Sequence, residues 1–184
     1  SLIALIIYEY MEINIYYEAI CESLQPIVNE LLEYEFPKKP RNSKVFNESE
    51  GKIYIDAFDE SRAQYDAAYI LNNIANTPGV IKIFVVHKDL YYPGYEFLYG
   101  AALNGKIIIS DNRIYNNNKN LKKELLHEIG HALGLKHCNR QCVMKPETSR
   151  KSIKDKSGDF CFLCRKKVEK IKKYYWLYNC DIVS

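Results

Sequence analysis

The sequence predicts a fold of the α/β class, in which helices pack on a sheet. The chain has 184 residues, and 47% of them are apolar, which is enough to bury one sizeable core. Val80–His87 and Lys106–Ser110 are strand-length runs rich in branched apolar residues. Other segments repeat apolar residues at the spacing of a helix. We therefore expect one domain that spans residues 1–184.

The N-terminal part is predicted to begin with a strand and a helix. Leu2–Tyr8 is a continuous apolar run, which is typical of a buried strand. The apolar spacing in Ile13–Leu24 predicts an amphipathic helix. Pro26 is expected to kink or end it, although Ile27–Leu32 can continue it. Tyr34–Phe36 is a candidate second strand.

The next segment is more polar. Arg41–Gly51 is expected to be an exposed loop, and Lys52–Phe58 alternates weakly, as a strand or loop would. Asp59 or Ser61 could cap a helix that runs over Arg62–Ala75.

The predicted sheet continues with Val80–His87, and Asp89–Gly94 then forms a turn. Glu96–Tyr99 is expected to be a short aromatic strand, and Lys106–Ser110 is expected to be the last strand of the sheet. The asparagines of Asn116–Asn120 offer several N-caps for a following helix.

That helix carries the most informative motif of the chain. His127 and His131 are four residues apart, so a helix places both imidazoles on one face. Glu128 stands beside the first of them. Gly134 accepts the left-handed conformation that ends a helix, so the chain can turn and bring His137 back as a third ligand. The alternative is an amphipathic helix whose histidines merely face inward.

Three neutral imidazoles would leave the fourth position of a tetrahedral zinc ion open, which is the pattern of a catalytic site. A carboxylate next to such a site is placed to act as a general base. The motif therefore predicts a catalytic zinc held by His127, His131 and His137, with Glu128 as the base.

A second cluster follows the histidines. Cys138 and Cys142 are followed by Cys161 and Cys164, and this spacing suits a closed thiolate zinc site with a structural role. The alternative is four unrelated thiols in a reducing cell. Two zinc ions, one catalytic and one structural, are therefore expected. Met144 comes shortly after the second cysteine. Metzincin metallopeptidases place a methionine in a turn beneath the zinc site, and in this context Met144 is expected to have that role, the alternative being a methionine that only fills the core.

These motifs together resemble the archaemetzincins. The resemblance rests on His127–Cys138, on Cys142–Met144 and on the distal pair within Cys161–Cys164. Arg62–Tyr65 and Phe97–Gly100 also look like segments of that family. The loops that precede Cys142 and Cys161 are each one residue shorter than the family pattern.

The resemblance implies a two-lobed metzincin fold. Residues 1–137 would form an upper lobe with a twisted mixed sheet, an antiparallel strand at the edge of the cleft and the active-site helix. Residues 138–184 would form a lower lobe with the turn at Met144, the cysteine zinc and a C-terminal helix over Arg165–Tyr178. It also implies a zinc metallopeptidase, with aminopeptidase action as one form of that activity.

A peptide substrate is expected to lie along an edge strand and to bind through main-chain hydrogen bonds. The residues predicted to border this cleft are Glu96, Phe97, Leu98 and Tyr99. The residues that could stabilise the oxyanion are Tyr65, Tyr95, Tyr99 and Lys136.

Charge and composition bear on the partners. The net charge is only +3, but Arg150–Lys173 is rich in lysine and arginine. A solvated helix face explains that run best, so nucleic acid is not expected as a partner. No apolar run approaches the ~20 residues of a membrane span, and we expect a cytoplasmic protein, with a monomer favoured. The alternatives are a zinc-stabilised binding or nucleic-acid-interaction protein and a zinc amidase or deaminase that acts on a small molecule.

Overall fold

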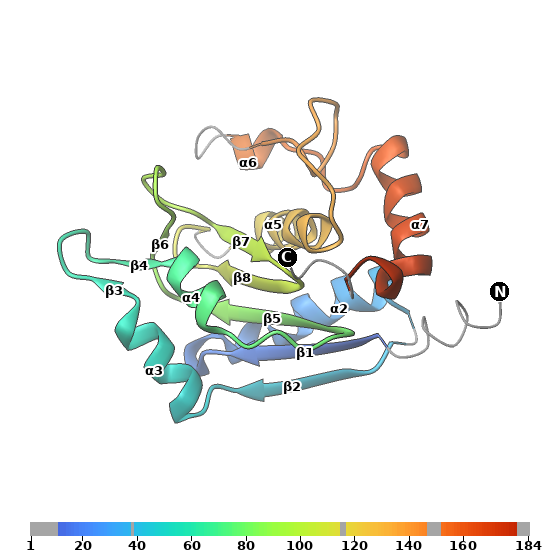
Figure 1. Ribbon diagram of the computed structural model, residues 1–184. Coiled ribbons are helices and arrows are strands. Elements are labelled where there is room, and N and C mark those ends of the chain that lie inside the picture. The colour runs from blue at the N-terminus through green and yellow to red at the C-terminus, as the bar shows by residue number, and fades with distance from the viewer. Residues whose placement is uncertain (1–10, 38, 115–116, 147–151, 180–184) are drawn as a thin grey trace.

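A five-stranded mixed sheet forms the centre of the computed structural model, which describes residues 11–37, 39–114, 117–146 and 152–179 (Figure 1). The strand order is β2-β1-β5-β8-β7. Every neighbouring pair is parallel except β7 and β8, which are antiparallel. The strands are β1 (Glu12–Tyr17), β2 (Arg41–Val45), β5 (Val80–Val86), β7 (Gly100–Leu103) and β8 (Lys106–Ser110).

Helices cover both faces of this sheet (Figure 1). One face carries the 3₁₀ helix η1 (Ala19–Leu24), α2 (Gln25–Glu35) and α5 (Asn118–Ala132). The other carries α3 (Glu48–Asp56) and α4 (Ala67–Asn73). The sheet is therefore buried on both sides, which explains why its central strands are apolar almost throughout.

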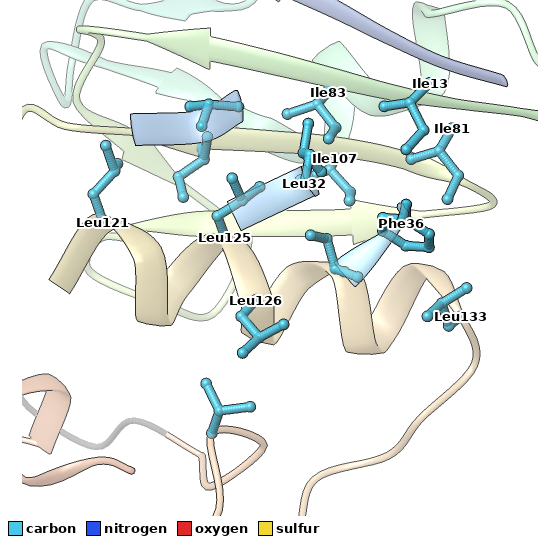
Figure 2. Close-up of a cluster of buried hydrophobic side chains, with 14 of the residues drawn as sticks. Ile13, Leu32, Phe36, Ile81, Ile83, Ile107, Leu121, Leu125, Leu126 and Leu133 are labelled. Carbon is cyan, nitrogen blue, oxygen red and sulfur yellow. The ribbon is translucent and has the colours of Figure 1, made fainter. Parts of the chain in front are cut away.

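The strand period of two divides the buried side chains between the two faces. In β5, Ile81, Ile83 and Val85 pack toward α2 and α5, whereas Phe84 and Val86 pack toward α3 and α4. Figure 2 shows the first of these cores, in which leucines of α2 and α5 meet isoleucines of the sheet. This packing fixes the position of α5 beneath the edge of the sheet.

A small second sheet and a C-terminal segment complete the fold. The small sheet contains β3 (Phe58–Asp59), β4 (Gln64–Asp66) and β6 (Leu90–Tyr91), in the order β3-β4-β6. The C-terminal segment contains α6 (Ser152–Asp155) and α7 (Phe162–Asn179). Among the described helices, none has both the length and the apolar composition that crossing a bilayer requires.

The first predicted elements are partly wrong. The strand expected over Leu2–Tyr8 lies outside the described residues. The helix expected over Ile13–Leu24 is wrong, because the chain forms β1 and then η1 there. Alternate residues from Ile13 to Tyr17 are buried, so the period of two outweighs the helical spacing that the same residues offer.

Pro26 does not end a helix, because it lies in the first turn of α2, where a missing N–H costs no hydrogen bond. α2 then runs through Ile27–Leu32 to Glu35. The strand expected over Tyr34–Phe36 is therefore wrong, and Phe36 is the C-cap of the helix.

The polar segment that follows is more regular than expected. Arg41–Gly51 is not a loop, because it contains β2 and the start of α3. β2 is an edge strand with mostly exposed side chains, which accounts for its polar sequence. Asn47 and Glu50 form a capping box that starts α3, so Lys52–Phe58 is mainly helical rather than a strand or loop.

The expected helix over Arg62–Ala75 is shorter than predicted, since α4 begins only at Ala67. Its cap is Asp66, whose carboxylate accepts from the Tyr69 N–H, so neither Asp59 nor Ser61 has this role. The predicted turn that follows β5 contains the short strand β6.

The best predictions concern the longest and most regular runs. β5 and β8 confirm the strands predicted over Val80–His87 and Lys106–Ser110, and α5 confirms the predicted helix that carries the histidines. α7 confirms the C-terminal helix over Arg165–Tyr178, although it starts three residues earlier.

Candidate metal centres and active-site cleft

The local sequence of α5 explains how the histidines are placed. Asn117 caps the helix, since its side chain accepts from the Asn120 N–H. At the other end Gly134 has φ +88°. The N–H groups of Gly134 and Leu135 bond to the carbonyls of His131 and Gly130, at 2.8 Å and 2.9 Å. These two bonds form a Schellman motif, which stops the helix and turns the chain toward His137.

Backbone carbonyls orient two of the imidazoles. The Nδ1 atom of His127 lies 2.9 Å from the carbonyl oxygen of Val143, and that of His131 lies 2.9 Å from the carbonyl oxygen of Leu135. A carbonyl only accepts, so each Nδ1 carries the proton and each Nε2 has a free lone pair. The two Nε2 atoms are 3.0 Å apart. Two bare lone pairs at this distance repel each other unless a cation lies between them.

The third histidine completes a set of donors that suits zinc. The ligand atoms of His127, His131 and His137, here called the histidine cluster, lie within 4.8 Å of one another. Two ligands at ~2.05 Å in a zinc tetrahedron would be about 3.3 Å apart. Burial lowers the pKa of His127 to about 2 and also lowers that of His131. Both imidazoles therefore stay neutral, which is the form that binds a metal.

Four cysteines form a second candidate metal centre. The sulfur atoms of Cys138, Cys142, Cys161 and Cys164, here called the cysteine cluster, lie within 4.8 Å of one another, and all four cysteines are free. The Cys164 backbone N–H donates to the Cys161 sulfur and lowers the pKa of Cys161 to about 7. Burial raises the pKa of Cys164 and Cys142. A soft cation would allow all four to ionise together, so this donor set also fits zinc.

A methionine turn connects the two clusters. Val143, whose carbonyl accepts from His127, precedes Met144, whose side chain is fully buried. The Met144 carbonyl accepts a hydrogen bond of 2.9 Å from the N–H of Cys138, the residue that directly follows His137. Packing of Met144 against α5 depends on Gly130, because a Cβ at that position would lie 2.3 Å from the Met144 sulfur. The turn therefore supports both α5 and the loop that follows it.

We expect Gly130→Ala to destabilise the protein by about 1–3 kcal/mol, because the added methyl must displace the buried Met144 side chain. Urea unfolding of the zinc-loaded protein measures this loss. Gly51→Ala is the matched control, since Gly51 is also helical and a Cβ there meets no atom within 4 Å. Equal stability of the two variants would contradict the tight contact.

Glu128 lies in a cleft between α5 and the edge of the sheet. Its side chain is buried, and its Cγ lies 3.0 Å from the place where a Cβ on Gly100 would be. The absence of that Cβ lets β7 approach α5 closely. The cleft has a volume of about 960 Å³ and is lined by Glu128, all of the histidine cluster and residues 94–102. β7 pairs only with β8 among the described strands, so its outer edge faces no other strand.

The predicted cleft residues fall in this region, with one correction. Glu96, Phe97, Leu98 and Tyr99 line the cleft. They do not form the expected strand, because only Leu98 makes an isolated bridge, to Leu90, and β7 starts after them.

The oxyanion candidates are divided by the structure. Tyr95 and Tyr99 line the cleft, whereas Tyr65 and Lys136 are not part of its lining. Tyr65 instead lies in β4, where its ring packs on Phe58.

Some residues of the site were missed by sequence reasoning. Glu124 precedes Glu128 by one helical turn and also lines the cleft. It forms an ion pair with Lys156, at 3.7 Å, and both side chains are buried. The four-residue spacing between Glu124 and Glu128 could have indicated that both lie on the same face of the helix. Nothing in the sequence places Lys156 beside them. The carbonyls of Val143 and Leu135 carry no sequence signal, since every residue has one.

A mixed sheet with an antiparallel edge strand, packed on a helix whose two histidines cluster with a third from the following loop, is typical of zinc metallopeptidases. The model of peptidase family M54 matches residues 37–170. An archaemetzincin of Saccharolobus solfataricus is 33% identical over 168 residues, which cover 82% of this chain and 88% of that protein. An archaemetzincin of Archaeoglobus fulgidus is 32% identical over 136 residues, 69% of this chain and 82% of that protein.

Two crystal structures of archaemetzincins are also similar. That from Archaeoglobus fulgidus, complexed with malonate, has a TM-score of 0.74 and 27% identity, and the match covers 85% of this chain and 99% of that one. The structure from Methanopyrus kandleri has a TM-score of 0.76 and 23% identity, and the match covers 89% of this chain and 96% of that one. It supports the fold. The chain belongs to peptidase family M54, the archaemetzincins. It is a zinc metallopeptidase, a hydrolase that acts on peptides.

Proposed function

We propose that the chain is one catalytic domain that hydrolyses peptide bonds at the histidine cluster, with Glu128 as the general base. One observation carries this proposal: the Nε2 atoms of His127 and His131 converge to 3.0 Å in the cleft that also contains the Glu128 carboxylate. When bound to this cluster, zinc supplies Lewis acidity, which acidifies water and polarises a carbonyl group.

The protein groups carry the proton transfer. The Glu128 carboxylate accepts a proton from a water molecule as the oxygen of that water attacks the scissile carbonyl carbon. Glu128 then donates this proton to the leaving nitrogen. Burial of Glu128 beside β7 keeps competing solvent away from the carboxylate. An extended peptide binds antiparallel to the outer edge of β7, where free backbone groups can form a ladder with it. Tyr95 and Tyr99 are the oxyanion candidates that remain in the cleft.

We also propose that the cysteine cluster holds a second zinc ion with a structural role. Four thiolates close all positions of a tetrahedral ion, so no position is left for a substrate. Cys138 of this cluster directly follows His137 in the chain, and its N–H donates a hydrogen bond to the Met144 carbonyl. Binding of this zinc would therefore hold the third histidine and the methionine turn in place.

Metal content and cleavage test the two parts of the proposal separately. We expect two zinc ions per purified chain, and one in a Cys142→Ser/Cys164→Ser variant. We expect digestion of a peptide mixture to stop on chelation and to resume with added zinc. Mass spectrometry of the products separates internal cuts from removal of N-terminal residues, which would indicate an aminopeptidase. Cleavage that survives chelation, or a chain that binds nucleic acid but cuts no peptide, would contradict the proposal.

A further inference from the structure

A second cavity, of about 540 Å³, lies between the loop that follows α5 and the first half of α7. We call it the basic groove. Four cationic side chains and several apolar side chains line it. The residues that define it are Lys136, Arg140, Lys167, Lys170, Leu163 and Ile171.

The cations of the basic groove differ from the other basic residues of α7. On the α2 side, Arg165 and Lys172 are paired with the buried Glu35. Within the described part of the chain, no carboxylate lines the groove, and none of its four cations forms an ion pair. All four side chains are exposed. Cys138 and Cys164 of the cysteine cluster also line the groove, and four thiolates around one zinc ion would leave two negative charges there. Four cations outnumber these two charges, so the groove presents a net positive charge to its occupant.

The basic groove lies next to the catalytic cleft, because His137 lines both cavities. A substrate chain that passes His137 would therefore reach the groove. Leu163, which is 45% exposed at the start of α7, offers an apolar contact in the same groove. An extended substrate could therefore contact the groove without leaving the surface that begins at β7.

No phenylalanine, tyrosine or tryptophan lines the basic groove among the described residues, so it lacks the platforms on which bases of a nucleic acid stack. We propose that the basic groove binds an acidic, carboxylate-bearing segment of the peptide substrate and so selects substrates with acidic residues beside the scissile bond. This inference rests on the proposed function, in which the bond is cut at the histidine cluster. Cations around a groove favour acidic partners and speed their association.

The test uses two labelled peptides and the zinc-loaded, full-length Glu128→Gln variant, which holds a substrate without cutting it. One decapeptide contains four glutamates among leucines, and the other has glutamine at those four positions. Fluorescence anisotropy measures the binding of each peptide at low salt. A second variant adds Lys167→Glu and Lys170→Glu. A matched control adds Lys52→Glu, on α3, and Lys119→Glu, at the far end of α5, which change the net charge equally.

We expect the acidic peptide to bind about tenfold more tightly than its glutamine counterpart, and this preference to fall as salt is raised. The groove variant should lose the preference, and the control should keep it. Equal binding of both peptides, or equal loss in the two charge variants, would overturn the proposal. Displacement of the acidic peptide by a single-stranded oligonucleotide but not by unlabelled peptide would assign the groove to nucleic acid and overturn it too.

Cleavage of the glutamine peptide by the protein with native Glu128 is measured alongside. If that protein cuts no peptide while the groove still selects the acidic one, the proposed function fails and the groove assignment stands. The same measurement is made on a protein that carries Lys167→Glu and Lys170→Glu but keeps native Glu128. If this protein and the unmutated protein cut the glutamine peptide equally, the catalytic centre is intact, and any loss with the acidic peptide belongs to the groove.

Discussion

Glu128→Gln is expected to lower kcat about 10²–10⁴-fold, because glutamine has nearly the same shape but cannot accept and return a proton. The side chain is buried between α5 and β7, so an amide fits the same space. Zinc content should stay the same, because the zinc ligands are the three histidines and Glu128 is not among them. Steady-state hydrolysis of a peptide found in the digest, with metal analysis of the same sample, measures both effects.

The matched control is Glu96→Gln, which removes an exposed carboxylate from the lining of the same cleft. We expect its kcat to change by no more than a few-fold, because an exposed group at the rim acts mainly through screened, long-range charge. A Glu128→Gln protein that turns over as fast as the control would remove Glu128 from the mechanism. Loss of zinc from that variant would show that the residue supports the site in another way.

Glu35→Ala is expected to destabilise the folded protein by about 3–5 kcal/mol, because it removes the one buried carboxylate that the buried Lys172 and the half-buried Arg165 share. Glu35 ends α2, and its side chain is fully buried. Arg165 donates to both of its carboxylate oxygens, at 2.8 Å and 3.0 Å. The Lys172 ammonium group, also buried, donates to the Glu35 carbonyl at 2.5 Å and to its carboxylate at 3.0 Å. This network attaches α7 to α2.

Denaturant unfolding of the zinc-loaded protein measures the loss. Glu169→Ala is the control, because Glu169 pairs with the same two cations, at 3.7 Å and 3.3 Å, but its side chain is 59% exposed. We expect that variant to lose less than about 1 kcal/mol. A Glu35 variant no less stable than the control would show that the network does not hold α7 in place.

The sequence could predict the parts of the fold and site that local spacing determines. Two histidines four residues apart face one way on any helix, and Gly134 marks the end of that helix through its own backbone freedom. β5 and β8 are covered on both faces, so their sequences are mostly branched apolar residues, and both strands were predicted correctly.

Other parts depend on contacts that no short stretch of sequence specifies. Ile13–Tyr17 satisfies both a helical and a strand pattern, and pairing with β2 and β5 decides for the strand. β2 is polar because it lies at an edge, so its sequence reads as a loop. Lys156 meets Glu124 only because the segment after Met144 returns to α5.

An anomalous difference map at the zinc absorption edge, from crystals of the purified protein, tests the central claim most directly. The account predicts a peak about 2.0–2.1 Å from a ring nitrogen of His127, His131 and His137. It predicts a second peak about 2.3 Å from the four sulfur atoms of the cysteine cluster. A map with zinc at the cysteines and none at the three histidines, in crystals grown with zinc, would contradict the account.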